Sequence, residues 1–165
     1  GSIMASETTA AATGAVGVLR HDPMAMKPFC GYHMGDYFQH WIDMGEKVKN
    51  PPKIFNVNWF RTDDDGNFMW PGFGDNLRVL DWIIDRCDGK VDAQETAIGY
   101  LPYAKDINLE GLDMTEEDLD KILDVDKDAW EEELKGVDEL YAKFGDKLPK
   151  ELADELASVK KALED

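Results

Sequence analysis

The sequence is poor in cysteine and in basic residues, and it has no long apolar run. Cys30 and Cys87 are the only cysteines among 165 residues. They supply neither a disulfide framework nor a zinc site, and they fit a reducing cytoplasm. The 35 acidic residues against 18 basic ones give a net charge of −17, which argues against nucleic acid or an anionic membrane as a partner. No stretch approaches the ~20 apolar residues that span a bilayer.

The chain also lacks an initiator methionine and the basic flank of a signal peptide. Its Gly1-Ser2 start suggests either a tag remnant or a cut through a longer protein. A hydrophobic content of 43% with five tryptophans predicts a globular domain with a real core. Composition divides the chain into small polar residues 1–15, an α/β part over residues 16–112, and an acidic helical part over residues 113–165. The last part holds 19 acidic residues and eight lysines.

Hydrophobic spacing predicts the α/β class, with a small mixed or antiparallel sheet and a helical C-terminal third. Strands are expected over residues 16–19, 54–60, 67–70 and 96–101. One helix is expected over residues 34–48, with Met34, Tyr37, Phe38, Trp41 and Ile42 on its apolar stripe. The next begins near Leu77, with Leu77, Leu80, Ile83 and Ile84 inward and Arg78, Asp81 and Asp85 toward water. Three further helices are expected to begin at Thr115, Asp126 and Pro149.

Residues 58–76 hold five aromatic side chains within nineteen positions. An Asp-Asp-Asp-Gly turn separates two aromatic-ended strands, which is a hairpin signal, and Gly66 stands where a positive φ is needed. Beyond the hairpin, Asp75 or Asn76 is suited to cap the following helix. From these residues alone, an aromatic hairpin core is the favoured interpretation.

No metal site is expected in the chain. The aspartates before Gly66 suggest a calcium loop, but that register places Arg61 first and Gly72 twelfth, where a glutamate is needed. His33 and His40 could share a helix face, yet no third ligand accompanies them, so both are interpreted as structural.

Residues 58–76 resemble the guanine-binding segment of the GTP-dependent phosphoenolpyruvate carboxykinases. That family writes it as Asn-Trp-Phe-Arg, a short acidic turn, and then Trp-Pro-Gly-Phe-Gly-acidic-Asn. The resemblance implies that Phe60, Phe68 and Phe73 form walls around guanine and that Asn76 meets its Watson–Crick edge. An Asn amide can accept from guanine N1–H while it donates to O6. A free amide could flip to suit adenine, so discrimination requires the amide to be held rigidly.

Two further segments are similar to the family. Residues 21–32 follow its His-Asp-Pro loop with departures such as Met24 and Lys27, and the retained Phe29 matches an aromatic that lines the oxaloacetate pocket. The small residues before Gly14 resemble the family's mobile active-site lid, whose short side chains lose little rotamer entropy on closing. The implied lid residues are Ser6, Glu7, Thr8, Thr9, Ala10, Ala11, Ala12 and Thr13.

The resemblance implies an enzyme that converts oxaloacetate and GTP to phosphoenolpyruvate, CO2 and GDP. In the family, the phosphate-binding loop and the Mn2+ ligands precede the matched region, and this chain contains no Gly-Lys-Thr-like motif. It is therefore expected to be a cytoplasmic enzyme's C-terminal fragment, without catalytic or metal-binding residues of its own and inactive alone. The full-length enzyme is expected to be a monomer, and the fragment could self-associate through an exposed sheet edge. The alternative is a non-catalytic acidic interaction module.

Overall fold

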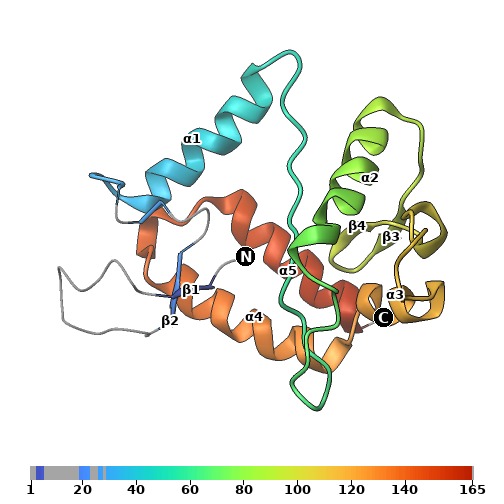
Figure 1. Ribbon diagram of the computed structural model, residues 1–165. Helices are drawn as coiled ribbons and strands as arrows, with labels where there is room; N and C mark the ends of the chain where they lie inside the picture. The colour runs from blue at the N-terminus through green and yellow to red at the C-terminus, as the bar shows by residue number, and fades with distance from the viewer. Residues whose placement is uncertain (1–2, 6–18, 23–25, 28, 165) are drawn as a thin grey trace. The chain divides into compact units, whose positions relative to one another are not determined.

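The computed structural model describes residues 3–5, 19–22, 26–27 and 29–164. Five α-helices and four short strands are found in these ranges (Figure 1). None of the helices in these ranges combines the length and the hydropathy that a membrane span requires. The strands are β1 (Ile3–Ala5), β2 (Leu19–His21), β3 (Gln94–Thr96) and β4 (Gly99–Leu101). The helices are α1 (Met34–Lys47), α2 (Asn76–Asp88), α3 (Glu116–Leu123), α4 (Lys127–Ala142) and α5 (Lys150–Glu164). Single 3-10 turns cover Phe73–Asp75, Ala104–Asp106 and Gly145–Lys147.

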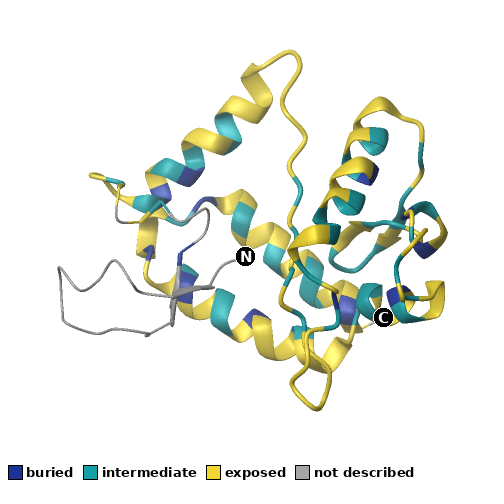
Figure 2. Cartoon of the chain, in the orientation of Figure 1, coloured by how far each residue is buried: buried dark blue, intermediate teal, exposed yellow. Residues whose placement is uncertain are grey.

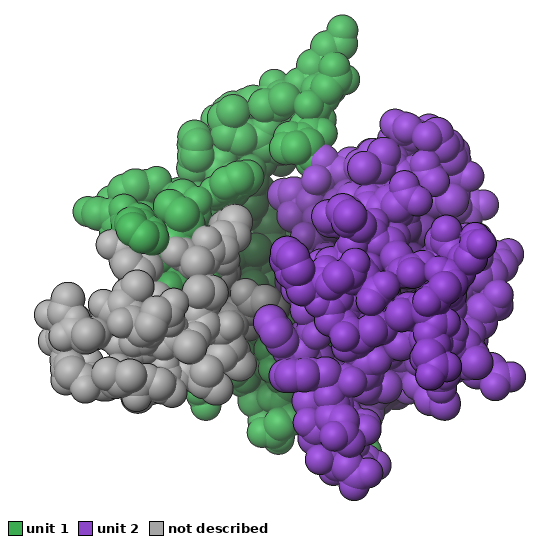
Figure 3. Space-filling view, in the orientation of Figure 1, with its two compact units in different colours: residues 1–52, 128–165 green, residues 53–127 purple. Residues whose placement is uncertain are grey.

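The chain divides into two compact units, which Figure 3 colours separately. One consists of residues 1–52 and 128–165, and the other of residues 53–127. The division into three parts made from composition stays a prediction.

The strands form two separate antiparallel pairs in the described part of the chain. β1 pairs with β2, and β3 pairs with β4 through Gln94 opposite Leu101. A mixed α and β composition is confirmed, but the single sheet predicted from four strands is wrong. Residues 54–60 form no strand, and residues 67–70 contribute one isolated bridge, between Thr62 and Phe68. The strand predicted over residues 96–101 comprises the last residue of β3, the turn and β4, and residues 16–18 lie outside the described ranges.

The segment before the aromatic hairpin shows why a strand was expected there. Phe55, Val57 and Trp59 are half-buried, whereas Asn56 and Asn58 between them are exposed. This is the period of two that an extended chain produces on a half-buried surface. The predicted alternation of burial is confirmed, although the segment pairs with no other strand. Alternation requires only an extended chain, whereas a β-strand also requires a neighbouring strand that shares its backbone hydrogen bonds.

The core of residues 53–127 is built around two tryptophans. Trp70 and Trp82 are buried together with Ala104, Ile107 and Leu119. Phe55 meets Trp82 edge-to-face at 6.3 Å between ring centroids, and Trp59 lies tilted against Trp70 at the same separation. Two of the five aromatic residues within residues 58–76, Trp59 and Trp70, therefore belong to the core, and the other three are exposed.

α2 buries a different face from the one predicted. Trp82 is buried and Val79 and Ile83 pack beside it, whereas Leu77, Leu80 and Ile84 are exposed (Figure 2). Of the predicted stripe, only Ile83 packs against this core. The helix is apolar around much of its circumference, so its hydrophobic spacing did not determine which side is covered. Its predicted end is confirmed, because Gly89 follows Asp88 with φ of 72°.

The other unit has a smaller aromatic core. Phe38 from α1 is buried with Leu140 and Phe144, and Met34 and Tyr37 pack against them. Trp41, which the predicted stripe of α1 included, is exposed. His33 is the N-cap of α1, where its Nδ1 accepts from the Gly35 N–H at 3.0 Å. Its ring also meets Phe144 edge-to-face at 6.1 Å between centroids, so its observed contacts are structural.

The three C-terminal helices begin where their cap residues predicted. Thr115 and Asp118 form a reciprocal capping box on α3, and α4 and α5 begin directly after Asp126 and Pro149. Several acidic side chains of α4 and α5 pair with lysines of the same two helices, as in Lys160 with Asp138 at 2.7 Å. Such ion pairs lie on solvent-exposed helix faces and contribute little to stability.

Candidate functional site

The turn of the aromatic hairpin is held by the carboxylate of Asp63. Its Oδ1 accepts from the backbone N–H of Asp65 at 3.0 Å and of Asn67 at 2.8 Å, while Oδ2 accepts from Asn67 Nδ2. The backbone and side-chain hydrogen bonds from Asn67 lower the pKa of Asp63. Gly66 has φ of 81°, which confirms the predicted positive-φ position. Both carboxylate oxygens of Asp63 therefore accept hydrogen bonds from residues of the turn itself.

Arg61 anchors the hairpin to the end of α3. Its Nη1 donates to the carbonyl oxygens of Ile122 at 2.6 Å and Asp124 at 2.8 Å. The carbonyls at a helix C-terminus lack intrahelical partners, and a guanidinium satisfies them while complementing the negative end of the helix dipole. A contact over sixty residues of sequence therefore positions the aromatic hairpin.

The three phenylalanines predicted to hold a base are all exposed. Phe60 and Phe68 are 71% and 65% exposed and meet at 5.9 Å between centroids, with their planes 62° apart. Phe73 is 91% exposed, and within the described ranges its ring contacts neither of the other two. The contact between Phe60 and Phe68 makes a contiguous exposed apolar surface, which is the kind of surface that marks interaction sites.

Asn76 follows Phe73 by one helical turn. Its backbone N–H donates to the Phe73 carbonyl, and its side chain is partly exposed. Its Oδ1 accepts from the indole N–H of Trp70 at 2.9 Å. The amide predicted to meet a base edge is thus connected both to the predicted wall and to the buried core.

The loop between Trp70 and α2 has a glycine backbone at Gly72, where φ is 124°. A Cβ at Gly72 or Gly74 would meet no atom within 4 Å, so the side of the loop that a larger residue would occupy is open. Asp75 is the N-cap of α2 without a side-chain cap bond, contrary to one predicted option. Its carboxylate instead accepts from Arg78 Nε at 2.9 Å.

Arg78, which was expected to face water, fastens this loop to a distant segment. Its Nη1 donates to the Asn108 carbonyl at 2.7 Å and its Nη2 to the Glu110 carbonyl at 3.0 Å. Together with Asp75, these partners use three donors of the guanidinium fork. The start of α2, and with it Asn76, is held by this arginine.

The other predicted site residues lie elsewhere or outside the description. Phe29 is 76% exposed and belongs to the unit of residues 1–52 and 128–165, whereas the three phenylalanines and Asn76 belong to the other unit. The predicted lid residues 6–13 lie outside the described residues. Among the described residues, no group of three His, Cys, Asp or Glu side chains could hold a metal ion.

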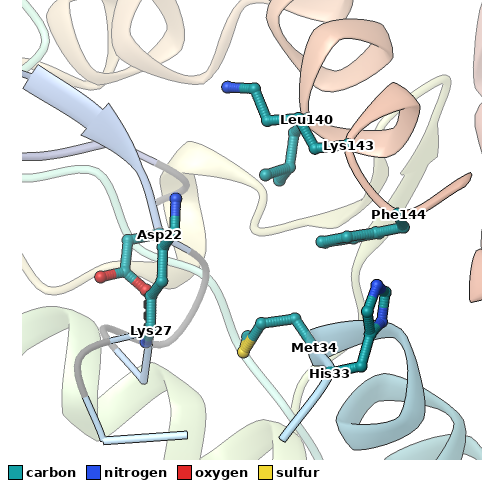
Figure 4. Close-up of a pocket in the computed structure, with 7 residues that line it drawn as sticks. All are labelled: Asp22, Lys27, His33, Met34, Leu140, Lys143 and Phe144. Carbon is teal, nitrogen blue, oxygen red and sulfur yellow. Dashed lines mark hydrogen bonds between the residues drawn. The ribbon is translucent and has the colours of Figure 1, made fainter.

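A small cavity of about 190 Å³ lies in the unit that contains Phe29. Figure 4 shows its side chains, which come from the loop after β2, the start of α1 and the end of α4. Asp22 on its wall is fully buried and accepts from the Lys27 backbone N–H at 2.9 Å. The cavity is smaller than the roughly 300 Å³ at which pockets for drug-sized ligands begin. The residues that line it are Asp22, Lys27, His33, Met34, Leu140, Lys143 and Phe144.

Sequence reasoning missed Arg61, Arg78 and the contact between Trp70 and Asn76. Each of these side chains reaches a partner that no local pattern identifies. One signal was available, since an arginine inside an otherwise aromatic or apolar run is often held by carbonyl or carboxylate oxygens.

The family model described as the phosphoenolpyruvate carboxykinase C-terminal P-loop domain matches residues 1–162 of the chain. A protein of Arthrobacter sp. (strain FB24), named phosphoenolpyruvate carboxykinase [GTP], is 54% identical over 168 residues, which cover 100% of this chain and 27% of the relative. Proteins of the same name from Anaeromyxobacter sp. (strain K) and Treponema pallidum (strain Nichols) are 53% and 54% identical and cover 93% and 94% of the chain. In each of these two cases, 26% of the relative is covered.

The chain thus spans about a quarter of the length of the curated relatives it matches. The family match runs through both compact units and includes the aromatic hairpin, Asn76 and the helices that follow. This chain belongs to the GTP-dependent phosphoenolpyruvate carboxykinase family and corresponds to part of its C-terminal P-loop domain.

Proposed function

We propose that this chain supplies the guanine-binding part of an enzyme that converts oxaloacetate and GTP to phosphoenolpyruvate, CO2 and GDP. The observation that carries the proposal is the exposure of Phe60, Phe68 and Phe73 beside a partly exposed Asn76. The relatives are named for GTP, and four residues of this kind in one run provide both stacking faces and a polar edge for a purine.

The rings and the amide have separate tasks in this proposal. Stacking on an aromatic ring contributes about 1–3 kcal/mol per base and is indifferent to which base it is. Selection for guanine therefore belongs to Asn76 and to the backbone near Gly72 and Gly74, where no Cβ limits the approach of a ligand. The hairpin turn at Asp63 and the Arg61 anchor hold the rings in place without covering them.

The phosphates, the metal and the reacting carbon atoms belong to other parts of the enzyme in this proposal. The described residues offer no group of three metal ligands, so the Mn2+ of the family does not fit here and no step is assigned to it. Phosphoryl transfer depends mainly on positioning and charge neutralisation. What this chain contributes is the position of the base, and through it the position of the triphosphate. A cytoplasmic location and a monomeric full-length enzyme are parts of the same proposal.

Residues 6–13 and Phe29 are assigned by resemblance to a lid and to the oxaloacetate pocket. A closed lid would keep water from protonating the enolate to pyruvate. Replacing Ala10, Ala11 and Ala12 with bulkier residues in the full-length enzyme is expected to lower turnover and to raise pyruvate release. Unchanged turnover without extra pyruvate would rule out the lid.

We call the set of Phe60, Phe68, Phe73 and Asn76 the guanine clamp. It is tested by nucleotide binding to the full-length enzyme that carries this segment. Phe73→Ala and Phe68→Ala are each expected to weaken GTP and ATP alike, roughly 5- to 150-fold in Kd, because a stacking face is lost. Asn76→Ala is expected to reduce the preference for GTP over ATP. Ile84→Ala is the control, since Ile84 is also exposed but lies eight residues along α2, about 12 Å along the helix axis.

Equal GTP affinity in the wild type, Phe73→Ala and Phe68→Ala would exclude Phe68 and Phe73 as base walls. Weakening by Ile84→Ala as large as that by Phe73→Ala would show that the exposed apolar surface acts through folding and not through a base.

A further inference from the structure

The side-chain amide of Asn76 has one partner, and that partner determines its orientation. The indole Nε1 of Trp70 is 2.9 Å from Asn76 Oδ1. An indole N–H donates and never accepts, so the atom that faces it must be the amide oxygen. Across the described ranges, Asn76 Nδ2 makes no hydrogen bond. The amide therefore presents a fixed oxygen to the core and leaves a donor for a ligand.

An amide fixed in this orientation can distinguish between purines. At position 6, guanine carries an oxygen that accepts, whereas adenine carries an amino group that donates. An amide that rotates freely suits either base, because its oxygen and nitrogen exchange places. In this structure, rotation would set the NH2 group of Asn76 against the N–H of Trp70, a residue that is 6% exposed. A buried donor left without an acceptor disfavours that orientation by roughly 5- to 150-fold.

We propose that Trp70 is a specificity-determining positioning residue whose indole N–H locks the Asn76 amide so that Nδ2 donates to a 6-oxopurine and not to a 6-aminopurine. The inference rests on the proposed guanine-binding function. By this inference, a tryptophan of the core that is 6% exposed controls the preference between two nucleotides. Trp70 acts only through Asn76.

Trp82 shows that this hydrogen bond is not simply a requirement of burial. It lies in the same core and is 5% exposed, yet its Nε1 has no partner among the described residues. Burial in this core therefore does not by itself supply an acceptor, although an indole N–H without one carries the cost stated above. The chain offers two buried tryptophans that differ in this one bond, and they form a matched pair for experiment.

The test compares Trp70→Phe with Trp82→Phe in the full-length enzyme, measuring Kd for GTP, ITP and ATP. Both substitutions remove an indole N–H and about the same core volume. Trp70→Phe is expected to lower the ratio of ATP Kd to GTP Kd by roughly 5- to 150-fold. ITP, which shares the 6-oxo group but lacks the 2-amino group, should follow GTP. Trp82→Phe should leave the ratio within about twofold of the wild type, because general loosening cancels in a ratio.

A ratio that is unchanged in Trp70→Phe but falls in Asn76→Ala would overturn the lock and leave the guanine clamp standing. If Asn76→Ala also leaves the ratio unchanged, or ITP behaves like ATP, the proposed reading of position 6 fails as well.

A second measurement covers the case in which Trp70→Phe does not fold. In the wild-type enzyme bound to GTP, the Trp70 indole proton should exchange slowly with solvent, and the Asn76 Nδ2 resonances should shift with GTP and ITP but not with ATP. Rapid exchange of that indole proton in the GTP complex, or equal shifts with all three nucleotides, would overturn the inference.

Discussion

Two pairs of phenylalanines in this chain have similar ring geometry and opposite surroundings. Phe38 and Phe144 lie 5.6 Å apart and are each 8% exposed, whereas Phe60 and Phe68 lie 5.9 Å apart and are mostly exposed. Leucine, methionine and tyrosine side chains cover the first pair. The second pair stands on a hairpin that Asp63 and Arg61 hold through hydrogen bonds. Ring contact alone therefore does not make a core, and polar anchors can hold an aromatic surface open.

The largest expected effect is a difference between the two pairs in the unfolding free energy that is lost when one phenylalanine is replaced. Phe144→Ala should cost about 3–5 kcal/mol, because it leaves a cavity beside Phe38 and Leu140. Phe68→Ala should cost at most about 1.5 kcal/mol, the value of an aromatic pair. Denaturant unfolding of both variants measures the contrast. Equal losses of unfolding free energy in the two variants would mean that the hairpin rings are covered, and would contradict the contrast between the two pairs.

The next effect tests whether polar anchors replace burial at the hairpin. Arg61→Ala removes both hydrogen bonds to the α3 carbonyls and should cost about 1.5–3 kcal/mol, the range for bonds to a charged group. Arg61→Lys, which keeps the charge without the planar fork, should fall between Ala and the wild type. Stability measured by urea unfolding should drop together with GTP affinity. A stable variant with unchanged affinity would show that the hairpin needs no anchor.

A smaller effect depends on pH and concerns α3, to which Arg61 binds. Hydrogen bonds from Lys121 and Thr115 lower the pKa of Asp118 from 3.8 to about 2. Because the pKa in the folded state lies below the ordinary value, this stabilisation is fully present above about pH 4 and is lost as the pH falls toward 2. Helicity and stability should decline over that window. Asp118→Asn should remove that part of the decline, and a decline that persists unchanged would exclude the capping carboxylate as its cause.

The smallest effect is expected on the exposed side of α2. Leu77→Gln and Ile84→Gln should each change stability by no more than about 0.5 kcal/mol, since both side chains already lie in water. Val79→Ala, on the covered side, is the contrasting variant and should destabilise measurably. Thermal unfolding of the three variants decides which face of α2 is core. A large loss from Leu77→Gln would restore the stripe predicted from spacing.

Helix caps and turns were predictable from the sequence where both partners of the interaction are close neighbours in the chain. The capping residue Thr115 finds Asp118 three residues later, and the turn at Asp63 closes on Gly66 and Asn67. Both interactions form within one turn of chain. The starts of α4 and α5 followed from the same kind of signal.

The candidate site was predictable only as a set of residues. Phe60, Phe68, Phe73 and Asn76 followed from a resemblance over nineteen positions, and the match over residues 1–162 confirms the family. Their roles stay predictions. The oxygen-inward orientation of the Asn76 amide could not be predicted, because it depends on where Trp70 places its indole N–H.

The sequence by itself determined the family, the capping box of α3, the glycine turn and the alternation of Phe55, Val57 and Trp59, because these depend on residue type and short spacing. Only the tertiary structure decided which face of α2 is buried and whether extended segments find a strand partner. The hydrophobic effect favours burial of an apolar side chain, but it is non-directional and does not specify which neighbour covers that side chain. The long-range bonds of Arg61, Trp70 and Arg78 likewise exist only once the chain has folded.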